Sequence, residues 1–447
     1  MLGLAQHQRY GSALLDAVGS LGLFFGCGCG KTATVLDWVY RHVQTGEFGA
    51  VLVVCPASLQ DAWRLSIDRM SEFEGYTQEG IDAVREAVTI RSYQGISTRV
   101  SKTIRHRNGT TTSKYRYRLR SDVNHEWNAV IVDESHALGS HSSVQTEMCL
   151  ELAKLADHRV AMSGTPVTGG KDRADWSKLY GQANFIEPGT FRTWTEFKRS
   201  CVRSCDPWGK PSSYNEDVCE DIITSLGIFV RLDDVFDMPE CISTDIPVGL
   251  TPTASRAYQD ILKGRWIEHG VDIRVAGAQY GKLFQVCSGF LYRDDRTVEV
   301  LGSPKDNALK TVITATDGRV VVFARYRWTI DHLCELLPDA VRFDATSKGP
   351  TWKEFQYGEA RILITQYACG NAGLDLYASH TMVFYEPTLS ALQLDQAQDR
   401  IHRKGQTHAC RYYFLYAQGT YEEKAVRSIR SGVDVTRSLM KGWAENL

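Results

Sequence analysis

The chain has 447 residues, of which 43% are hydrophobic and 23% are charged. This composition is that of a globular protein with about three domains of roughly 150 residues or with two large ones, and it excludes collagen-like, mucin-like and wholly disordered chains. Because 51 Lys and Arg stand against 53 Asp and Glu, total charge does not indicate a nucleic-acid partner, and any basic surface must come from local patterning.

The pattern of the first half alternates short β-branched runs with helical stretches, which is typical of a parallel sheet with crossover helices. We expect strands at 21–25, 51–54, 88–90, 130–132 and 160–162, and again at 320–323, 362–364, 382–385 and 412–415. The predicted fold is therefore α/β, with two doubly wound parallel-sheet lobes at 1–240 and 241–447. We expect a basic insertion at about 99–122 and helical segments at about 168–230 and 250–303.

No apolar run approaches the roughly 18 residues that span a bilayer, and the first seven residues lack the pattern of a signal peptide. We therefore expect a cytoplasmic protein without a membrane partner. The 12 cysteines show no CxxC spacing, so we expect reduced thiols in packing roles. The set Cys201, Cys205 and Cys219 leaves a metal site open as the alternative.

The first chemical pattern directly follows the first predicted strand, where Gly26-Cys27-Gly28-Cys29-Gly30 leads into Lys31-Thr32 and a helix. Glycines allow backbone amides to turn toward an anion, and the helix N-terminus adds its dipole. Lys31 would reach the terminal phosphates of a nucleotide, and the Thr32 hydroxyl would ligate magnesium. This order predicts a phosphate-binding loop of the GxGKT type.

The second pattern is an apolar strand, Val130-Ile131-Val132, that ends in the adjacent acids Asp133 and Glu134. Alone, such a pair more often caps a turn. Together with the phosphate loop, it predicts that Asp133 holds magnesium and that Glu134 orients or deprotonates the attacking water.

Ordered patterns along nearly the whole chain resemble those of helicase superfamily 2 ATPases, most closely the Swi/Snf group of double-stranded-DNA translocases. They comprise His7-Gln8, the GxGKT loop, Val53 to Leu59 with Trp63, Ser92-Tyr93, Asp133-Glu134-Ser135-His136, which is DEAH-box-like, Ser163-Gly164-Thr165-Pro166, Val322-Phe323, Gly370 to Leu376, and Gln396 to Gln406. The last follows the pattern QxxDRxHRxGQ and is the most diagnostic.

The resemblance implies RecA-like lobes with ATP and Mg²⁺ as ligands. The nucleotide-binding residues that it implies are Gln8, Gly28, Cys29, Gly30, Lys31, Thr32, Gly373 and Asp375. Ser58, Ser92 and Thr165 would contact nucleic acid. Capping and core roles remain open for Ser58, Trp63 and Ser92-Tyr93, and Ser163 to Pro166 could instead be a tight turn at a strand end. Three places depart from the family pattern, namely Phe25-Gly26 before the loop, Asp375 in place of Asn, and Glu386-Pro387-Thr388 in place of Trp-Asn-Pro.

Arg400 and Arg403 are three residues apart, so on a helix they would share one face. We expect both guanidinium groups of the second lobe to stabilise the charge that develops on a γ-phosphate held by the first. The alternative is a solvated basic helix.

Between Glu86 and Asp122 the chain has no acidic residue, and it accumulates basic ones. Asn108-Gly109 is a hairpin-turn signal, and Lys114 to Leu119 alternates cationic and aromatic residues. We expect Arg105, Arg107, Lys114, Arg116 and Arg118 to contact the DNA backbone. A solvated loop and a protein-binding site remain alternatives.

The sequence thus predicts a minimal motor, of the kind phages and bacteria encode, that hydrolyses ATP and moves along double-stranded DNA without sequence readout. A recruiting protein is possible but not identified by any pattern. The alternatives are a strand-separating or branch-remodelling helicase and a catalytically weak DNA-binding adaptor that uses ATP structurally. Intact Lys31, Glu134, Arg400 and Arg403 argue against the adaptor.

Overall fold

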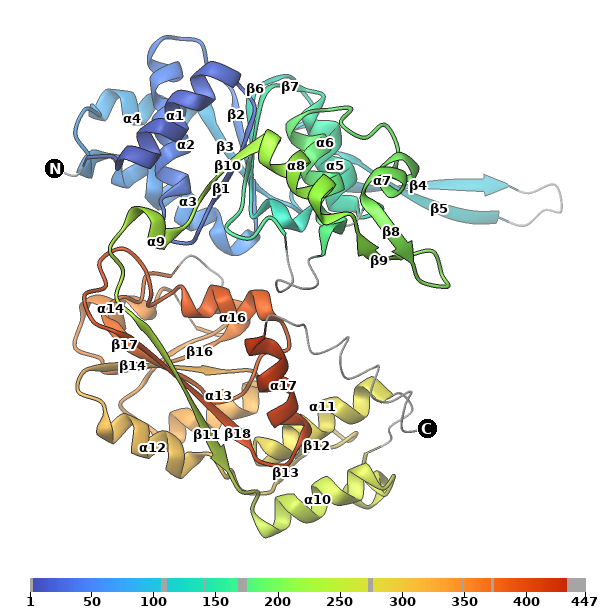
Figure 1. Ribbon diagram of the computed structural model, residues 1–447, viewed down its shortest axis with the longest axis vertical. Helices are drawn as coiled ribbons and strands as arrows, with labels where there is room; N and C mark the ends of the chain where they lie inside the picture. The colour runs from blue at the N-terminus through green and yellow to red at the C-terminus, as the bar shows by residue number, and fades with distance from the viewer. Residues whose placement is uncertain are drawn as a thin grey trace. The chain divides into compact units, whose positions relative to one another are not determined.

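The computed structural model describes residues 3–105, 111–139, 141–167, 175–271, 276–347, 349–370 and 374–431. These residues form two compact units, here called lobe 1, which ends at Asp237, and lobe 2, which begins at Met238. Each lobe contains a six-stranded sheet in which every strand pair is parallel (Figure 1). The predicted α/β fold with two parallel sheets is therefore confirmed.

The sheet of lobe 1 contains all five predicted strands and one more at its edge. Its order is β10 (Gly227–Val230), β1 (Leu21–Phe25), β7 (Ala156–Met162), β6 (Trp127–Asp133), β2 (Val51–Cys55) and β3 (Val88–Ser92). Side chains of β2 alternate between two cores, because successive residues of a strand point to opposite faces. Val51, Val53 and Cys55 pack on one face, whereas Leu52 and Val54 pack on the other.

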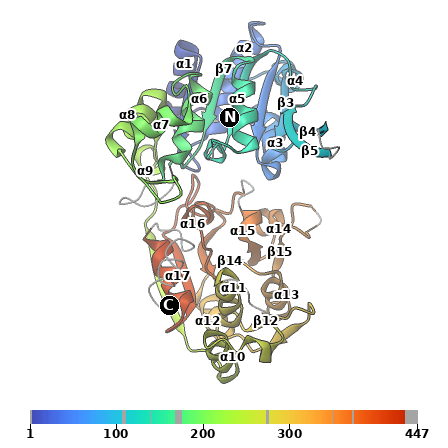
Figure 2. The same ribbon diagram turned by 90° about the vertical axis from the view of Figure 1, so that its right-hand side faces the viewer.

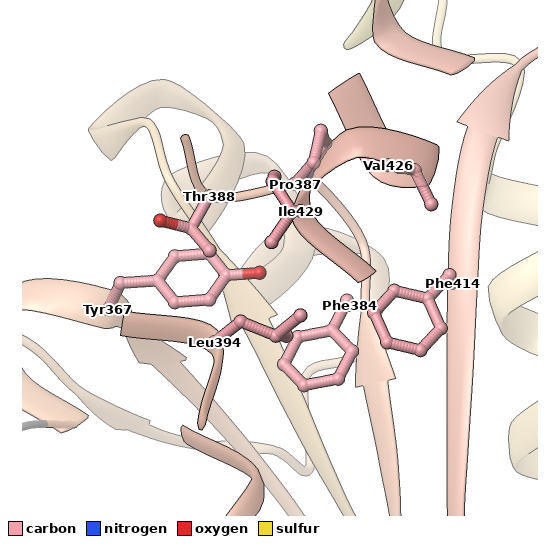
Figure 3. Close-up of a pocket in the computed structure, with 8 residues that line it drawn as sticks. All are labelled: Tyr367, Phe384, Pro387, Thr388, Leu394, Phe414, Val426 and Ile429. Carbon is pink, nitrogen blue, oxygen red and sulfur yellow. The ribbon is translucent and has the colours of Figure 1, made fainter. Parts of the chain in front are cut away.

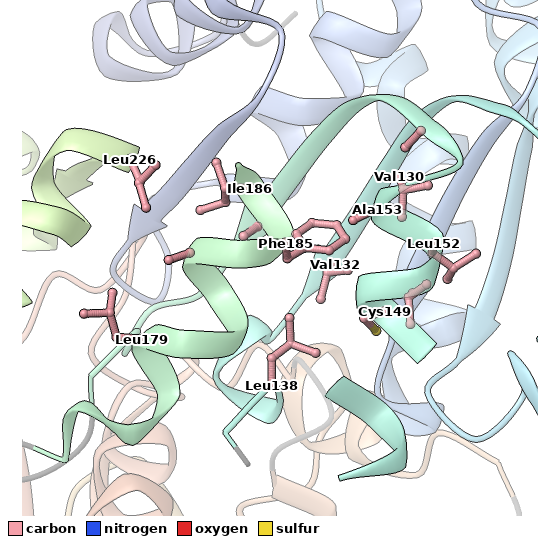
Figure 4. Close-up of a cluster of buried hydrophobic side chains, with 14 of the residues drawn as sticks. Val130, Val132, Leu138, Cys149, Leu152, Ala153, Leu179, Phe185, Ile186 and Leu226 are labelled. Carbon is pink, nitrogen blue, oxygen red and sulfur yellow. The ribbon is translucent and has the colours of Figure 1, made fainter. Parts of the chain in front are cut away.

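Helices cover both faces of this sheet (Figure 2). Those of lobe 1 are α1 (Gln6–Val18), α2 (Lys31–Gln44), α3 (Gln60–Asp68), α4 (Gln78–Ala87), α5 (Val144–Ala153), α6 (Leu179–Ile186), α7 (Trp194–Cys201), α8 (Glu216–Leu226) and α9 (Leu232–Val235), with short 3-10 turns at Ala57–Leu59, Arg69–Glu72, Ser135–Ala137 and Trp176–Lys178. The core that includes α5 and α6 is shown in Figure 4.

Two antiparallel hairpins extend the lobe beyond its sheet. As the alternating pattern predicted, β4 (Ser97–Arg105) pairs with β5 (Thr111–Leu119), and this hairpin projects from the lobe (Figure 1). The predicted turn at Asn108-Gly109 lies outside the described residues. The second hairpin, β8 (Val202–Cys205) with β9 (Pro211–Tyr214), and strand β10 correct the prediction that 168–230 is helical. Their strands have only four residues each, too few to show a period.

The sheet of lobe 2 has the order β11 (Cys241–Val248), β18 (Cys410–Ala417), β17 (Ser379–Phe384), β14 (Arg319–Ala324), β16 (Ile362–Gln366) and β15 (Val341–Phe343). Strand β11 is not among the strands that the sequence predicted. It pairs with β18 along eight residues, yet most of its side chains are exposed because it is an edge strand. It therefore lacks the apolar pattern that marks a buried strand.

Lobe 2 also has helices on both faces of its sheet. They are α10 (Pro252–Leu262), α11 (Ala276–Cys287), α12 (Asp306–Ala315), α13 (Arg327–Leu336), α14 (Trp352–Tyr357), α15 (Tyr367–Gly370), α16 (Ala391–Gln398) and α17 (Tyr421–Arg430), with a 3-10 turn at Trp266–His269 and a small hairpin of β12 (Phe290–Tyr292) and β13 (Val298–Val300). A buried ion pair joins α12 to α17, because Lys305 lies 2.5 Å from Glu422 and also donates to the Tyr385 carbonyl.

A small apolar cavity lies in lobe 2 between β17, β18, α16 and α17 (Figure 3). Its lining consists of Tyr367, Phe384, Pro387, Thr388, Leu394, Phe414, Val426 and Ile429. With a volume of about 10 Å³ it holds at most one water molecule, so it is a packing defect rather than a ligand site. No helix within the described parts of the chain has the length and apolar character needed to cross a membrane.

Candidate functional site

The predicted site residues of lobe 1 lie at one edge of its sheet. Lys31 follows β1, Ser58 follows β2, Ser92 ends β3, Glu134 follows β6 and Thr165 follows β7. Because these strands are parallel neighbours, their carboxyl ends share one edge. Ligands of open α/β sheets bind at this edge.

The glycine loop between β1 and α2 needs its glycines for conformation and for space. Gly28 and Gly30 have φ angles of 81° and 79°, which favour glycine. A Cβ on Gly30 would lie 1.9 Å from Nε2 of Gln8, so a larger residue would displace the Gln8 amide. Lys31 begins α2, and its ammonium donates to the Phe25 carbonyl at 2.8 Å. The loop thus brings backbone amides, Lys31 and Thr32 to the start of a helix.

Gln8 and His7, on α1, contact this loop from the side. The Gln8 amide accepts a hydrogen bond from the Ala5 N–H and lies 3.4 Å from the Cys29 carbonyl. Nε2 of His7 lies 2.8 Å from the same carbonyl. Gln8 is 8% exposed, so it supports the loop from a nearly buried position.

Asp133 ends β6 with its carboxylate held from two directions. Oδ2 accepts a hydrogen bond from the indole of Trp63, and Oδ1 accepts one from the Glu134 N–H, both at 2.9 Å. Burial, followed by the neighbouring charge of Glu134, raises the pKa of Asp133 to about 6, although the Trp63 hydrogen bond and Lys31 oppose this shift. The carboxylate is buried enough to favour a cation beside it.

Glu134 has a left-handed backbone, with φ 53° and ψ 49°. Its carboxylate lies 3.2 Å from Nδ1 of His136, and the same nitrogen lies 3.2 Å from the Ser163 hydroxyl. The Ser163 oxygen also accepts the Thr165 N–H at 3.1 Å. A chain of polar contacts therefore connects the turn after β6 to the turn after β7.

Two aromatic residues of the family patterns have a structural role that the sequence did not specify. Trp63 and Tyr93 were open to a core role, and both are buried. Each also holds the acidic turn, because Trp63 donates to the Asp133 carboxylate and the Tyr93 hydroxyl donates to the Asp133 carbonyl at 2.8 Å. The relevant signal is an aromatic residue with a polar tip near a predicted strand end.

The predicted nucleic-acid contacts of lobe 1 differ in exposure. Ser58 is exposed in the 3-10 turn after β2, whereas Ser92 and Thr165 are half-buried. The Ser92 hydroxyl accepts the Gly95 N–H at 3.0 Å, which is the capping role considered from the sequence. Arg116 and Arg118 are exposed on β5. Arg107 and the side chains of Arg105 and Lys114 lie outside the described residues.

In lobe 2, the structure corrects the prediction that Arg400 and Arg403 share a helical face. Helix α16 ends at Gln398, and both arginines lie in the turns that follow. The chain leaves the helix because the Arg400 carbonyl accepts the Leu376 N–H at 3.0 Å. In addition, the Gln406 amide donates to the Ser379 carbonyl at 2.8 Å and so ties the turns to β17.

The two arginines have different surroundings. Arg400 is 4% exposed, and its Nε has no hydrogen-bond partner among the described residues. Arg403 forms an ion pair with Asp375 at 2.7 Å and donates to the Leu374 carbonyl at 2.9 Å. The departure from Asn at position 375 thus supplies a charge partner for Arg403. Gly373 lies outside the described residues.

Another departure from the family pattern also has a structural role. Glu386, 1% exposed, accepts the backbone N–H groups of Arg325 and Tyr326 and the hydroxyl of Thr329. Its carboxylate therefore caps the start of α13. As for a metal at Cys201, Cys205 and Cys219, the described residues contain no group of three or more His, Cys, Asp or Glu that could hold an ion.

Two family matches cover most of the chain. Residues 20–276 match the SNF2-related domain, and residues 304–405 match the helicase conserved C-terminal domain. Since the first match alone spans more than half of the chain, the chain belongs to the SNF2-related family and has the two domains of its helicase-like ATPases.

Its relatives include proteins named for work on DNA. The chain is 24% identical over 439 residues to the DNA annealing helicase and endonuclease ZRANB3 of Bos taurus, covering 94% of this chain and 39% of that protein. It is 24% identical over 503 residues to the DNA repair and recombination protein RAD54-like of Danio rerio, covering 95% and 65%. The chain thus spans less than two thirds of the length of either relative.

Among solved structures, the chain is similar to the Sulfolobus solfataricus SWI2/SNF2 ATPase core in complex with double-stranded DNA. The identity is 17%, the TM-score is 0.42, and the match covers 96% of this chain and 90% of that one.

Proposed function

We propose that this protein is a DNA-dependent ATPase that couples ATP hydrolysis to movement along, or remodelling of, double-stranded DNA. The observation that carries the proposal is the polar chain at the carboxyl edge of lobe 1. It links Glu134 through His136 to Ser163 and Thr165. An acid that can orient water is therefore linked to a turn predicted to contact DNA.

The donor set of lobe 1 fits ATP and Mg²⁺. Gly28 and Gly30 carry no Cβ, so backbone amides can face phosphate oxygens there, and Lys31 adds a positive charge. The Thr32 hydroxyl and the Asp133 carboxylate are oxygen donors, which Mg²⁺ prefers. When bound, the ion neutralises phosphate charge. Glu134 then orients or deprotonates water, and Gln8 lies beside the loop for contact with the base.

The arginines of lobe 2 fit a role toward the γ-phosphate. Arg400 has a nearly buried guanidinium whose Nε lacks a described partner, which is costly unless an anion satisfies it. Arg403 is held in place by Asp375. We assign both to stabilising charge that develops in the transition state, with nucleotide binding at lobe 1 and these groups supplied by lobe 2.

The contacts that we propose with DNA are contacts with its phosphates. Ser58, Ser92 and Thr165 stand at one sheet edge, and the projecting hairpin β4–β5 carries exposed Arg116 and Arg118. The hairpin contacts would add affinity without sequence readout, since phosphate contacts position a protein and do not specify bases. The names of the relatives, which refer to annealing, repair and recombination of DNA, agree with this substrate class.

The test is the ATPase rate of the purified chain without nucleic acid and with single-stranded DNA, double-stranded DNA, branched DNA or RNA. We expect duplex DNA to stimulate turnover more than single strands or RNA. Equal stimulation by single-stranded RNA would contradict the duplex assignment. A preference for forked DNA with release of a strand would identify a strand-separating or branch-remodelling helicase. Absence of turnover under all conditions, with ATP bound, would identify a DNA-binding adaptor.

A further inference from the structure

Helix α6 carries a polar side chain, Gln182, in a buried position. Gln182 is 1% exposed, and the helix around it is otherwise largely apolar, with Leu179, Ala183 and Phe185 in the same core. Burial of an amide is unfavourable unless both its ends are hydrogen-bonded. The hydrogen bonds of this amide therefore identify the groups that it holds in place.

The two ends of the amide bind two different turns. Its Oε1 accepts the hydroxyl of Ser135 at 2.8 Å. Its Nε2 donates to the carbonyl of Pro166 at 2.7 Å, with a weaker contact to the Lys178 carbonyl of its own helix at 3.3 Å. Because one end only accepts and the other only donates, the side chain fixes both partners in a defined order.

Each of these partners is the chain neighbour of a residue in the proposed site. Ser135 directly follows Glu134, and Pro166 directly follows Thr165. The link through Gln182 is independent of the one through His136 and Ser163, since the two links share no side chain. The turns after β6 and β7 are therefore bridged twice.

A glycine brings α6 close enough for this bridge. A Cβ on Gly181 would lie 2.2 Å from the Leu138 carbonyl oxygen and 2.9 Å from the Leu138 Cβ. Leu138 is fully buried between α6 and α5 (Figure 4). Helix α6 therefore packs directly on the segment that follows Glu134. A displacement of the helix would displace that segment as well.

We propose that Gln182 is a positioning residue, which transmits the binding of duplex DNA at the turn of Thr165 to the orientation of Glu134. This inference rests on the proposed function. The amide holds the Ser135 hydroxyl and the Pro166 carbonyl at a fixed separation, so movement of the second turn moves the first. An apolar side chain of the same length fills the space but holds neither partner.

The test compares Gln182→Met with a matched control, Asn184→Leu. Asn184 is on the same helix and 7% exposed, but its amide bonds Phe191 and Tyr180 and neither turn. The readouts are turnover with and without saturating duplex DNA, the half-stimulating DNA concentration and the KM for ATP. For Gln182→Met we expect the ratio of stimulated to unstimulated turnover to fall about 2- to 30-fold. We expect both concentrations to stay unchanged, and the control to keep the wild-type ratio.

A second variant covers the case in which Gln182→Met does not fold. Ser135→Ala removes one end of the bridge without touching α6, and its ratio should also fall. Where both variants fold, combining them should cost no more than the larger single effect, because they break the same bridge. A folded variant that keeps the wild-type ratio overturns the inference, as does an equal fall in Asn184→Leu. A wild-type protein without DNA stimulation overturns the proposed function itself.

Discussion

Two adjacent carboxylates at the end of β6 have different environments. Asp133 is buried and fixed by the Trp63 indole and the Glu134 N–H, whereas Glu134 is turned by a left-handed backbone toward His136. One acid is thus held on both oxygens and shielded from solvent, and the other is partly exposed and contacts His136. This difference supports the assignment of Asp133 to the metal and Glu134 to water, as two acids in unlike surroundings take unlike roles.

The first prediction separates binding from hydrolysis at these residues. Lys31→Ala should weaken ATP binding and turnover together, because it removes the charge that meets the phosphates. Glu134→Gln should retain ATP and DNA binding while losing turnover, because only the group that activates water changes. Nucleotide affinity measured by fluorescence and turnover by phosphate release check both.

Lys154→Ala is the matched control, since Lys154 is exposed and pairs only with Glu151 among the described residues. It should leave both quantities unchanged. Hydrolysis that persists in Glu134→Gln would mean that another group activates the water.

At the residue scale, the sequence predicts the groups of the site better than what supports them. Lys31, Thr32, Asp133 and Glu134 follow strands in a recognisable order, so the two patterns together indicated them. Gln182 lies 47 residues from its partner Ser135, and Trp63 lies 70 residues from Asp133. These pairs meet only through the crossover order of the sheet, which local pattern does not encode.

The hairpin β4–β5 has two unlike faces. In antiparallel strands, residues opposite one another share a face. Val100 is opposite Arg116 and Thr98 is opposite Arg118, so the two arginines share one face. Tyr115 and Tyr117 are on the other, where the Arg99 guanidinium lies 3.5 Å from the centre of the Tyr115 ring. The aromatic face therefore already has a cation, and the face with Arg116 and Arg118 is the one that we assign to phosphate.

The second prediction is that Arg116→Gln with Arg118→Gln weakens duplex binding but preserves unstimulated ATPase. Each lost phosphate contact should lower the slope of log affinity against log salt by about 0.9. The loss should be the same for unrelated DNA sequences, and the half-stimulating DNA concentration should rise. Extending the change to Arg105, Arg107 and Lys114 should lower the slope further. Titrations with DNA at several salt concentrations measure the salt slope, its dependence on DNA sequence and the half-stimulating concentration.

The control pair is Arg85→Gln with Lys154→Gln, which removes the same charge from exposed residues near the opposite, amino edge of the sheet. It should keep the wild-type slope. A hairpin variant that also keeps the wild-type slope would assign the basic run to a solvated loop.

At the element scale, buried strands were predicted well, whereas the edge strands β10 and β11 were not. The runs at Leu21–Phe25 and Val51–Cys55 are buried throughout, and their apolar character is visible without a structure. Strands β10 and β11 lie at sheet edges, where pairing on one side is enough and an apolar pattern is not required. The helix expected at Arg400 and Arg403 failed for a tertiary reason, because the Leu376 N–H binds a carbonyl that a helix would need.

Over the whole molecule, each lobe has its own sheet and its own cores, so each can hold its groups without the other. Under the proposed function, the phosphate loop belongs to lobe 1 and the two arginines belong to lobe 2. Hydrolysis would then require both lobes, whereas nucleotide binding would depend mainly on the first. The third prediction therefore concerns both lobes together.

The third prediction is that Arg400→Ala and Arg403→Ala each lower turnover by about 10³- to 10⁵-fold, the range found for arginine fingers, with a much smaller change in ATP affinity. Arg427→Ala, an exposed arginine of lobe 2 paired with Glu423, should change neither. Single-turnover rates together with ATP titrations distinguish the two effects. Turnover that survives both changes would show that lobe 2 does not complete the site.

The left-handed backbone of Glu134 also bears on how this protein can be engineered. A residue with a Cβ is about 1 to 2 kcal/mol less favourable in this conformation than glycine, so the position has been kept at a thermodynamic disadvantage. Under the proposed function, glycine or asparagine at this position would relieve the backbone and remove the carboxylate together, which would yield a more stable protein without turnover. A screen for stable variants that includes this position therefore needs a turnover assay at every round.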